Sequence, residues 1–244
     1  MYTLKNNYNI EFLLRGLELL HIQISGEQIH QFLIFYEMLI EKNKVMNLTA
    51  ITDFEDVAVK HFLDSLCISR MLNLKDEMSV IDLGTGAGFP GIPLKIVYPE
   101  IHITLADSLN KRIMFLNDVI DELSLNNVST VHARAEEIGQ NKMYREQFHI
   151  CVSRAVAKLS VLCEYCLPLI KPGGFFISYK SADCINETEE AGKAIQVLGG
   201  KVETIEVFQI PGSEIGRSLI KIKKIKQTPK TYPRKSGTPG KNPL

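Results

Sequence analysis

A glycine-rich stretch, SVIDLGTGAGFPGIPLKI, runs from Ser79 to Ile96. Four glycines, Gly84, Gly86, Gly88 and Gly91, fall within eight positions of it. Because glycine loses the most conformational freedom on folding, such a run needs a compensating role. A strand-like run precedes the glycines and a helical pattern follows them. That arrangement is typical of a loop that lets a ligand approach the backbone and the N-terminus of a helix.

Three classes of ligand compete for this loop. A P-loop requires Gly-Lys-Ser/Thr after its glycines, and the sequence lacks it, which excludes that class. A dinucleotide requires G-x-G-x-x-G, which Gly86-Ala-Gly-Phe-Pro-Gly91 matches, but the strand ends near Leu83 and Pro90 interrupts the turn. The third candidate is S-adenosylmethionine (SAM). Asp82 at the strand end, followed by Gly84, Gly86 and Gly88, resembles the first motif of the Rossmann-like methyltransferases.

Residues beyond the next two strands support a nucleotide ligand. Asp107 lies 25 residues after Asp82 and ends a candidate strand. A carboxylate there accepts hydrogen bonds from both ribose hydroxyls. The alternative is that Asp107 caps the following helix, a role that Ser108 also fits. Ala135 and Glu136 follow the third strand, where such folds hold the edge of the adenine; the alternative for Glu136 is an ordinary acidic residue at a helix start.

Two groups of elements must position these residues. Residues 1–75 are expected to be helical: Ser25-Gly-Glu-Gln28 resembles a capping box before a strongly apolar helical face, and a second helix follows Thr52. From Ser79 onward, strand-like and helical runs alternate, which predicts a parallel, doubly wound sheet. The expected strands are 79–83, 102–106, 128–132, 148–152, 174–179, 202–208 and 218–225. The last two lack room for a helix between them, so we expect them to pair antiparallel.

The predicted organisation is therefore an α/β, Rossmann-like SAM-binding domain at 76–226, preceded by a small helical subdomain at 1–75. A basic tail rich in proline and glycine follows at 227–244 and is expected to be extended. The chain has no net charge, yet nine Lys/Arg and no acidic residue lie between Arg217 and Leu244. This asymmetry predicts an anionic partner for the C-terminal end, the alternative being a solubilising tail.

Composition excludes several classes of protein. The 244-residue chain has no apolar run of about 18 residues and no export signal at its N-terminus, so we expect a cytoplasmic protein without a membrane partner. Its five cysteines are expected to be reduced thiols. Cys163-Glu-Tyr-Cys166 has no second pair to complete a zinc site, so we interpret it as structural and expect no metal.

Longer motifs give a more specific resemblance. They are NLTAI (47–51), HFLDSL (61–66), DLGTGAGFPGIPL (82–94), DSLNKRIMFL (107–116), ARAEE (133–137), VSRAVAKL (152–159) and YPRKSGTPGKNPL (232–244). Together they resemble the bacterial small-subunit ribosomal RNA guanine-N7 methyltransferases of the G type, also called glucose-inhibited division protein B. The resemblance implies SAM-dependent methylation of N7 of a guanine in 16S ribosomal RNA. It also implies cofactor contacts at Gly84, Phe89, Ala135, Glu136 and Arg154. The family usually has Lys-Gly where this chain has Lys180-Ser181.

The sequence after the fourth strand agrees with an N7 target. Guanine N7 carries a lone pair and no proton, so the enzyme needs positioning more than acid–base catalysis. An enzyme that methylates an exocyclic amine is expected to show Asn/Asp-Pro-Pro-aromatic there, whereas this chain has Val152-Ser-Arg154-Ala. A pyrimidine-C5 enzyme needs a nucleophilic cysteine, and Cys151 falls within the strand. Arg154 is the predicted catalytic residue, in contact with the cofactor, guanine O6 or a phosphate; the alternative is a surface ion pair.

The RNA is expected to contact basic and aromatic residues. The predicted substrate-binding residues are Asn47, His61, Lys180, Arg217, Tyr232, Arg234 and Lys235. The lysines and arginines would bind phosphates, and Tyr232 would stack on an unpaired base. Asn47, His61 and Asp64 either line the RNA side of the cleft or brace the helical part against the sheet.

The predicted protein is thus a methyltransferase that uses SAM, with small-subunit ribosomal RNA or the 30S subunit as its partner, and a monomer. One rival is an NAD-dependent oxidoreductase, for which no convincing set of hydride-transfer partners is present. A second rival is a non-catalytic assembly factor that binds SAM and ribosomal RNA.

Overall fold

The structure, a computed structural model, describes residues 4–154 and 157–244. Their centre is a seven-stranded sheet with the order β3-β2-β1-β4-β5-β7-β6. Its strands are β1 (Ser79–Leu83), β2 (His102–Asp107), β3 (Val128–His132), β4 (Phe148–Ser153), β5 (Ile170–Ser181), β6 (Gly200–Gln209) and β7 (Gly216–Lys224). β1 to β5 run parallel to one another, whereas β7 pairs antiparallel with both β5 and β6. The predicted strands and the antiparallel pair at the end are confirmed.

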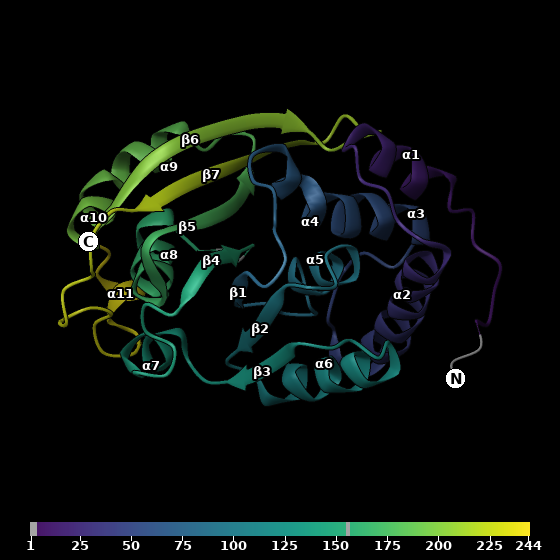
Figure 1. Cartoon of the computed structure of the whole chain (residues 1–244), viewed down its shortest axis with the longest axis horizontal. Helices are drawn as coiled ribbons and strands as arrows, with labels where there is room; N and C mark the ends of the chain where they lie inside the picture. Colours follow the sequence, from purple (N-terminus) through teal and green to yellow (C-terminus); the bar gives the residue numbers. More distant parts are fainter. Residues whose placement is uncertain (1–3, 155–156) are drawn as a thin grey trace.

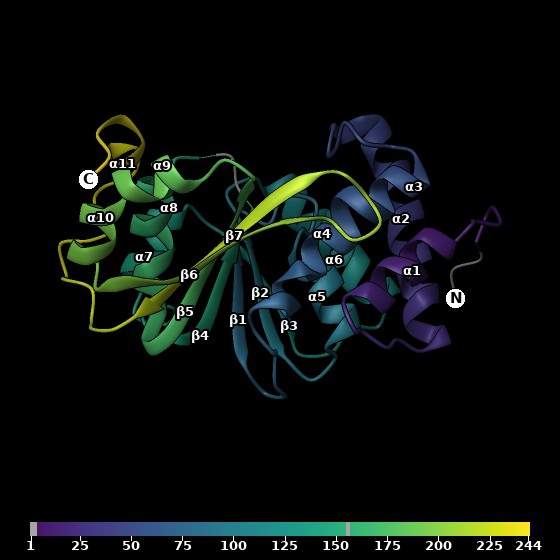
Figure 2. The ribbon, with the colours of Figure 1, turned by 90° about the horizontal axis from the view of Figure 1, so that it is seen from above.

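Helices cover both faces of this sheet. Figure 2 shows α1 to α6 on one side of the strands and α7 to α11 on the other. The first group is α1 (Glu11–Leu19), α2 (Gly26–Met46), α3 (Phe54–Val57), α4 (Asp64–Leu66), α5 (Gly91–Val97) and α6 (Asn110–Glu122). The second is α7 (Ala135–Gln140), α8 (Leu159–Cys166), α9 (Ile185–Glu190), α10 (Gly192–Val197) and α11 (Thr238–Lys241). Because both faces are covered, β1 is buried from Val80 to Leu83, and its one charged residue, Asp82, lies inside the molecule.

Two hydrophobic clusters correspond to the two layers. One joins the N-terminal helices, α5 and α6 to one face of the sheet; Phe32, Phe62 and Leu105 belong to it. The other lies between the sheet and α7, α8 and α10, and includes Cys163 and Cys166 of α8. All five cysteines are buried, and none of them forms a disulfide. Because the first cluster is shared, the N-terminal helices have no hydrophobic core of their own, and the domain boundary near residue 75 stays a prediction.

The helices before the sheet begin and end where local chemistry predicts. Ser25 and Gln28 form the predicted capping box: the Ser25 hydroxyl accepts from the Gln28 amide at 3.2 Å, and the Gln28 side chain accepts from the Ser25 amide at 2.8 Å. α2 ends at Asn47, which adopts the left-handed conformation with φ of 49°. The helix after Thr52 has a π-helical middle, Ala58–Leu63, between α3 and α4. π-Helical turns are rare in proteins overall, but those that occur are often found at functional sites.

The C-terminal segment, residues 227–244, differs from its prediction as an extended tail. It packs beside α7 and α8 and contains one helical turn, α11 (Figure 1). Thr228, Pro233 and Pro239 of this segment are buried. The reason is that neighbouring polar groups bind its backbone; the Arg145 guanidinium, for example, donates to the carbonyl oxygens of Thr228 at 2.8 Å and Tyr232 at 2.7 Å.

Two features of residues 4–154 and 157–244 concern membranes and metal ions. None of the helices there combines the length and the apolar content needed to cross a bilayer. The same residues hold no group of three or more His, Cys, Asp and Glu side chains that would bind a metal ion.

Candidate active site

The glycine loop leaves β1 at the point where the strand order reverses. β1 pairs with β2 on one side and with β4 on the other, which makes its carboxyl end a ligand-binding crevice in an open α/β sheet. Gly84 and Gly86 have φ of 73° and 63°, a region that side chains disfavour. The Gly84 amide donates to the carbonyl oxygen of Ala106 at 2.9 Å, and the Gly86 amide donates to Asp107 Oδ2 at 3.0 Å. The loop is therefore fastened to β2, with open space above Gly86.

Asp82 braces this loop from below. It is fully buried, and its Oδ2 accepts from Thr85 Oγ1 at 2.7 Å and from the Gly91 amide at 2.8 Å. Burial raises the pKa of Asp82 to about 6, against the lowering effect of these two hydrogen bonds. Asp82 does not line the cavity above the loop, because its carboxyl group is directed into the turn and the start of α5. Asp82 therefore supports the loop from below, and its contact with the cofactor stays a prediction.

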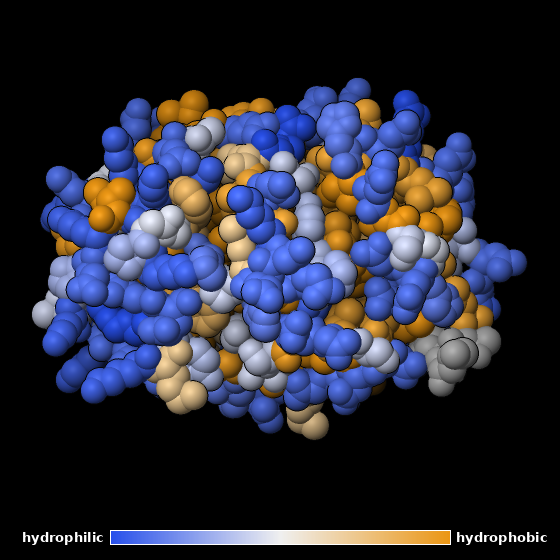
Figure 3. Space-filling view, viewed as in Figure 1, coloured by the Kyte–Doolittle hydropathy of each residue, from blue (hydrophilic) through white to orange (hydrophobic). Residues whose placement is uncertain are grey.

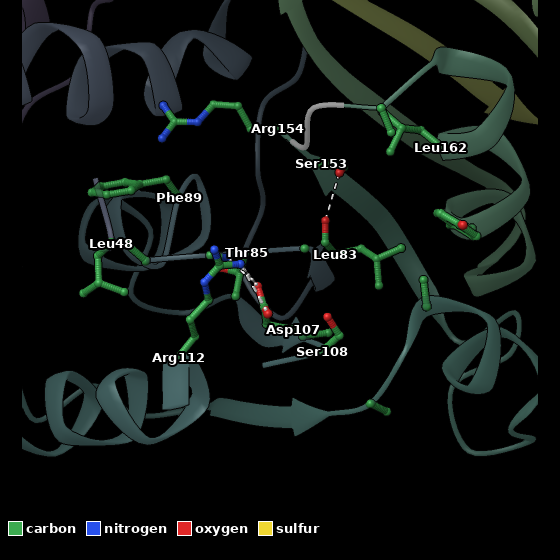
Figure 4. Close-up of a pocket in the computed structure, with 18 of the residues that line it drawn as sticks. Leu48, Leu83, Thr85, Phe89, Asp107, Ser108, Arg112, Ser153, Arg154 and Leu162 are labelled. Atoms are coloured by element: carbon green, nitrogen blue, oxygen red, sulfur yellow. Dashed lines mark hydrogen bonds and ion pairs between the residues drawn. The ribbon is translucent and has the colours of Figure 1, made fainter. Parts of the chain in front are cut away.

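A cavity of about 590 Å³ lies over the loop. It is lined by six of the predicted cofactor residues, namely Gly84, Gly86, Phe89, Asp107, Ala135 and Arg154. Asp107 is almost fully buried, and Figure 4 shows Arg112 directed at it. Arg112 Nη1 lies 3.1 Å from Asp107 Oδ2, while the Leu109 amide donates to Asp107 Oδ1 at 2.9 Å. The carboxylate at the end of β2 is therefore held rigidly at the wall of the cavity.

Arg154 lies where β4 ends, above the ring of Phe89 (Figure 4). Its guanidinium carbon is 5.1 Å from the Phe89 ring centroid, within the range of a cation–π contact. Arg154 Nη1 also forms an ion pair with Asp64 Oδ2 at 2.8 Å. Asp64 is almost fully buried in the helical part of the chain and also pairs with Arg217 of β7, at 3.3 Å. The ion pair predicted as the alternative for Arg154 thus exists, and it is partly buried within the site.

His61 lies in the π-helical turn, between Arg154 and Phe89. Its ring stacks on Phe89 with centroids 4.6 Å apart, and Arg154 Nη2 lies 3.2 Å from its Nδ1. Nδ1 also lies 3.1 Å from the carbonyl oxygen of Lys60, and Nε2 lies 2.8 Å from Thr49 Oγ1, so both ring nitrogens have polar partners. Burial, followed by the charge of Arg154, lowers the pKa of His61 to about 3. The imidazole is therefore neutral at physiological pH.

A second cavity, of about 870 Å³, adjoins the first. Arg154, His61 and Ala157 line both cavities. Around the second stand five cationic side chains, Lys60, Arg154, Lys158, Lys180 and Arg217, against the two carboxylates Asp64 and Glu187. Three of the predicted substrate-binding residues, His61, Lys180 and Arg217, therefore meet here. Figure 3 shows the exterior in the view of Figure 1, with hydrophilic side chains over most of the left and centre and the larger hydrophobic patches on the right, among the N-terminal helices.

Lys180 is held at this second cavity by two acceptors. Its ammonium donates to the carbonyl oxygen of Ala157 at 2.6 Å and to Glu187 Oε1 at 2.8 Å. Ser181, where the family usually has glycine, is still part of β5, so the departure leaves the strand intact. The stretch at 152–159 that carries part of the resemblance includes Ala155 and Val156, which lie outside the described residues.

The remaining predicted site residues do not line either cavity. A Cβ on Gly88 would lie 2.7 Å from Ile92, so this glycine permits close packing. Asn47 ends α2, because its left-handed backbone stops the helix. Glu136 lines neither of the two cavities, and its carboxylate accepts from the Gly237 amide at 2.8 Å. The other residues outside both cavities are Tyr232, Arg234 and Lys235, in the C-terminal segment.

The structure also brings in residues that the sequence did not single out. Thr49, Arg112 and Tyr165 line the first cavity, and Lys60 and Lys158 line the second. Arg112 follows Asp107 by five positions, in the first turn of α6, and this short separation is the signal that could have marked it. Thr49 and Tyr165 depend on how distant helices pack, and no local pattern marks them.

Known proteins resemble this chain along most of its length. The family model described as rRNA small subunit methyltransferase G matches residues 28–216. The Ribosomal RNA small subunit methyltransferase G of Lachnoclostridium phytofermentans is 52% identical over 231 residues, which are 95% of this chain and 96% of that protein. The protein of the same name from Bacillus licheniformis is 49% identical over 236 residues, 97% of this chain and 99% of its own length.

Solved structures share the fold at low sequence identity. M. jannaschii TYW2 in complex with AdoMet superposes with a TM-score of 0.51 at 18% identity, covering 64% of this chain and 74% of its own. TrmN from Thermus thermophilus has a TM-score of 0.51 at 15% identity and covers 66% of this chain and 48% of its own. The predicted Rossmann-like methyltransferase fold is confirmed. Given the extent of the family match and relatives that are about half identical along nearly their whole length, the chain belongs to the rRNA small subunit methyltransferase G family.

Proposed function

We propose that this protein transfers a methyl group from SAM to N7 of a guanine in small-subunit ribosomal RNA. The observation that carries the proposal is the pair of adjoining cavities, one over the glycine loop and one lined by cations, with Arg154 and His61 shared between them. Membership of the family supports the cofactor, the reaction and the kind of RNA.

The residues of the first cavity fit SAM. A volume of about 590 Å³ lies within the usual range for a small-molecule site. Asp107 offers carboxylate oxygens to a ribose, and the positive-φ glycines expose backbone without side chains in the way. Ala133 and Ala135 leave a flat apolar wall beyond β3 for an adenine. When bound, SAM would supply an electrophilic methyl group on its sulfonium. The residues of the chain would bind and orient SAM and the guanine.

The second cavity fits a guanine nucleotide of an RNA. Its excess of cationic side chains suits the phosphates that flank the target base. Arg154, which lines both cavities, would donate to O6, the acceptor next to N7 on the same edge of guanine. Because N7 has no proton to lose, the reaction needs no general base, and the neutral His61 is consistent with that requirement. The chain's contribution is to hold N7 in line with the methyl group.

The proposed substrate also sets where the protein acts. Because bacterial ribosomal RNA is made and assembled in the cytoplasm, we propose that the protein works there, as a monomer, on naked ribosomal RNA or the 30S subunit. RNA binding that depends on Lys60, Lys158 and Lys180 should weaken steeply with salt.

The test compares methyl transfer by wild type and Arg154→Lys, which keeps a charge beside Asp64 but loses the planar fork. Transfer to small subunits that lack the modification should fall by about 100-fold, the loss typical of one donor that stabilises a transition state. Lys193→Ala, an exposed cation on α10, is the control and should transfer at the wild-type rate. Arg154→Lys at full activity, with both proteins equally stable to heat, would exclude the role of Arg154.

A further inference from the structure

The basic C-terminal segment, residues 227–244, makes its polar contacts inward. Arg145, in the loop after α7, donates to the carbonyl oxygens of Gly139 at 2.8 Å, Thr228 at 2.8 Å and Tyr232 at 2.7 Å. One guanidinium thus links the end of α7 to two points of the segment. Thr228 is anchored a second time, because its amide donates to Glu146 Oε1 at 2.8 Å.

Arg234, one of the cations expected to bind RNA, forms an ion pair with a buried carboxylate. Glu164 of α8 has no exposed surface. Its Oε1 accepts from the Arg234 backbone amide at 2.8 Å and from Nε at 2.9 Å, and its Oε2 accepts from Nη2 at 2.6 Å. A buried carboxylate is strongly destabilising when it loses its partner, so moving the Arg234 guanidinium from Glu164 to a phosphate would be unfavourable. The Arg234 guanidinium therefore stabilises the fold.

α7 is held directly by the segment. Gln140 Nε2 donates to the carbonyl oxygen of Pro233 at 2.7 Å. The Pro233 ring lies so close to Gly139 that a Cβ there would approach its Cγ to 2.7 Å. At the other end of α7, the Gly237 amide donates to Glu136 Oε1 at 2.8 Å. Contacts at both ends fix the position of the helix.

This helix and its neighbour form one wall of the first cavity. Ala135, adjacent to Glu136, lines the cavity, and so does Tyr165 of α8. Burial, then the negative charges of Glu136 and Glu164, raises the pKa of Tyr165, so the Glu136 carboxylate lies near the Tyr165 hydroxyl. The Gly237 amide therefore binds the carboxylate of a residue that adjoins Ala135 in sequence and lies near Tyr165 in space.

We propose that the C-terminal segment is a structural part of the cofactor site and positions the adenine-side wall, Ala135 and Tyr165, through Gly237 and Glu136. This inference rests on the proposed use of SAM. The sequence predicted that the charge of this segment contributes to RNA affinity. The inference instead assigns the segment a contribution to cofactor affinity, because it positions residues of the cavity wall.

The test measures binding of S-adenosylhomocysteine by calorimetry, together with the melting temperature of the ligand-free protein. In Glu136→Gln, the negative charge on the acceptor of the Gly237 amide is lost, which weakens this charge-assisted hydrogen bond. In Arg234→Lys, the charge stays but the fork on Glu164 is lost. Both variants should raise the dissociation constant about three- to tenfold, the range expected for loss of one hydrogen bond. Two matched controls should bind as wild type: Glu137→Gln, with the same charge change one residue along, and Lys230→Gln, which removes an exposed cation of the segment.

The inference is supported if Glu136→Gln and Arg234→Lys bind S-adenosylhomocysteine more weakly while both controls bind it as wild type does. The melting temperatures of the two test variants should not fall in parallel with their affinity. If Arg234→Lys does not fold, Tyr165→Phe tests the cavity end of the same set of contacts with Glu136→Gln. Wild-type affinity in the test variants would overturn the inference and leave the proposed function standing. A wild-type protein that does not bind S-adenosylhomocysteine at all would overturn both.

Discussion

At the residue scale, the site consists of buried charged groups that hold one another in place. Asp64 forms ion pairs with Arg154 and Arg217. Asp107 accepts hydrogen bonds from Arg112 and from two backbone amides. Buried charges are tolerated only when they are paired and hydrogen-bonded, so these side chains have little freedom to move. A methyl transfer that depends on alignment benefits from such rigidity.

The neutral state of His61 predicts how acid affects stability. Its pKa is about 3 in the folded protein and about 6.5 when unfolded, so between these values the unfolded chain binds a proton that the native protein does not. Stability should therefore fall as pH drops from about 6.5 toward 3, by up to about 1.4 kcal/mol per pH unit for this group. Urea unfolding of wild type and His61→Gln at a series of pH values measures the difference. Parallel curves for the two proteins would contradict this assignment.

At the element scale, the sequence predicted the loop and the strand that carries it, because glycine spacing and apolar runs are local signals. It did not predict which groups face the ligand. Asp82 and Gly88 belong to the motif, yet they support the loop from inside, since the turn directs them at α5 and α6. The sequence also missed the inward packing of the C-terminal segment, because Glu164 and Arg145 lie far from it in sequence.

Gly91 shows how tightly the loop and α5 are joined. A Cβ at this position would lie 2.3 Å from a methyl group of Leu105 and 2.8 Å from Asp82 Oδ2. We expect Gly91→Ala to cost about 1–3 kcal/mol of stability, as overpacking does, and to weaken SAM binding because the loop must shift. The control is Gly192→Ala at the start of α10, where a Cβ meets nothing within 4 Å. Urea unfolding and calorimetry of the two variants check the expectation, which equal stability of both would refute.

At the scale of the whole molecule, the helices before β1 and the sheet form one hydrophobic core. α2 is also fastened to the end of α5 by Gln28 Nε2, which donates to the carbonyl oxygen of Ile96 at 2.6 Å. The ion pairs of Asp64 join the same two parts on the side of the site. The sequence predicted both groups of elements, but their shared core depends on contacts between distant segments that no local pattern reports.

This shared core predicts a single cooperative unfolding transition. Hydrogen exchange across a guanidinium series should show peptides from α2 and from β5 losing protection at the same denaturant concentration. Loss of protection in α2 at a clearly lower concentration would instead show that residues 1–75 unfold as an independent subdomain.

The central claim is methylation of guanine N7, and one measurement tests it most directly. Purified protein is incubated with SAM labelled in its methyl group and with small subunits from cells that lack the modification. The RNA is then treated with borohydride and aniline, which cleave the chain at N7-methylguanine. We predict label in the small-subunit RNA and cleavage at a single guanine. Label without cleavage would retain the methyltransferase and contradict N7 as its target atom, and SAM binding without any label would contradict the proposed reaction on this substrate.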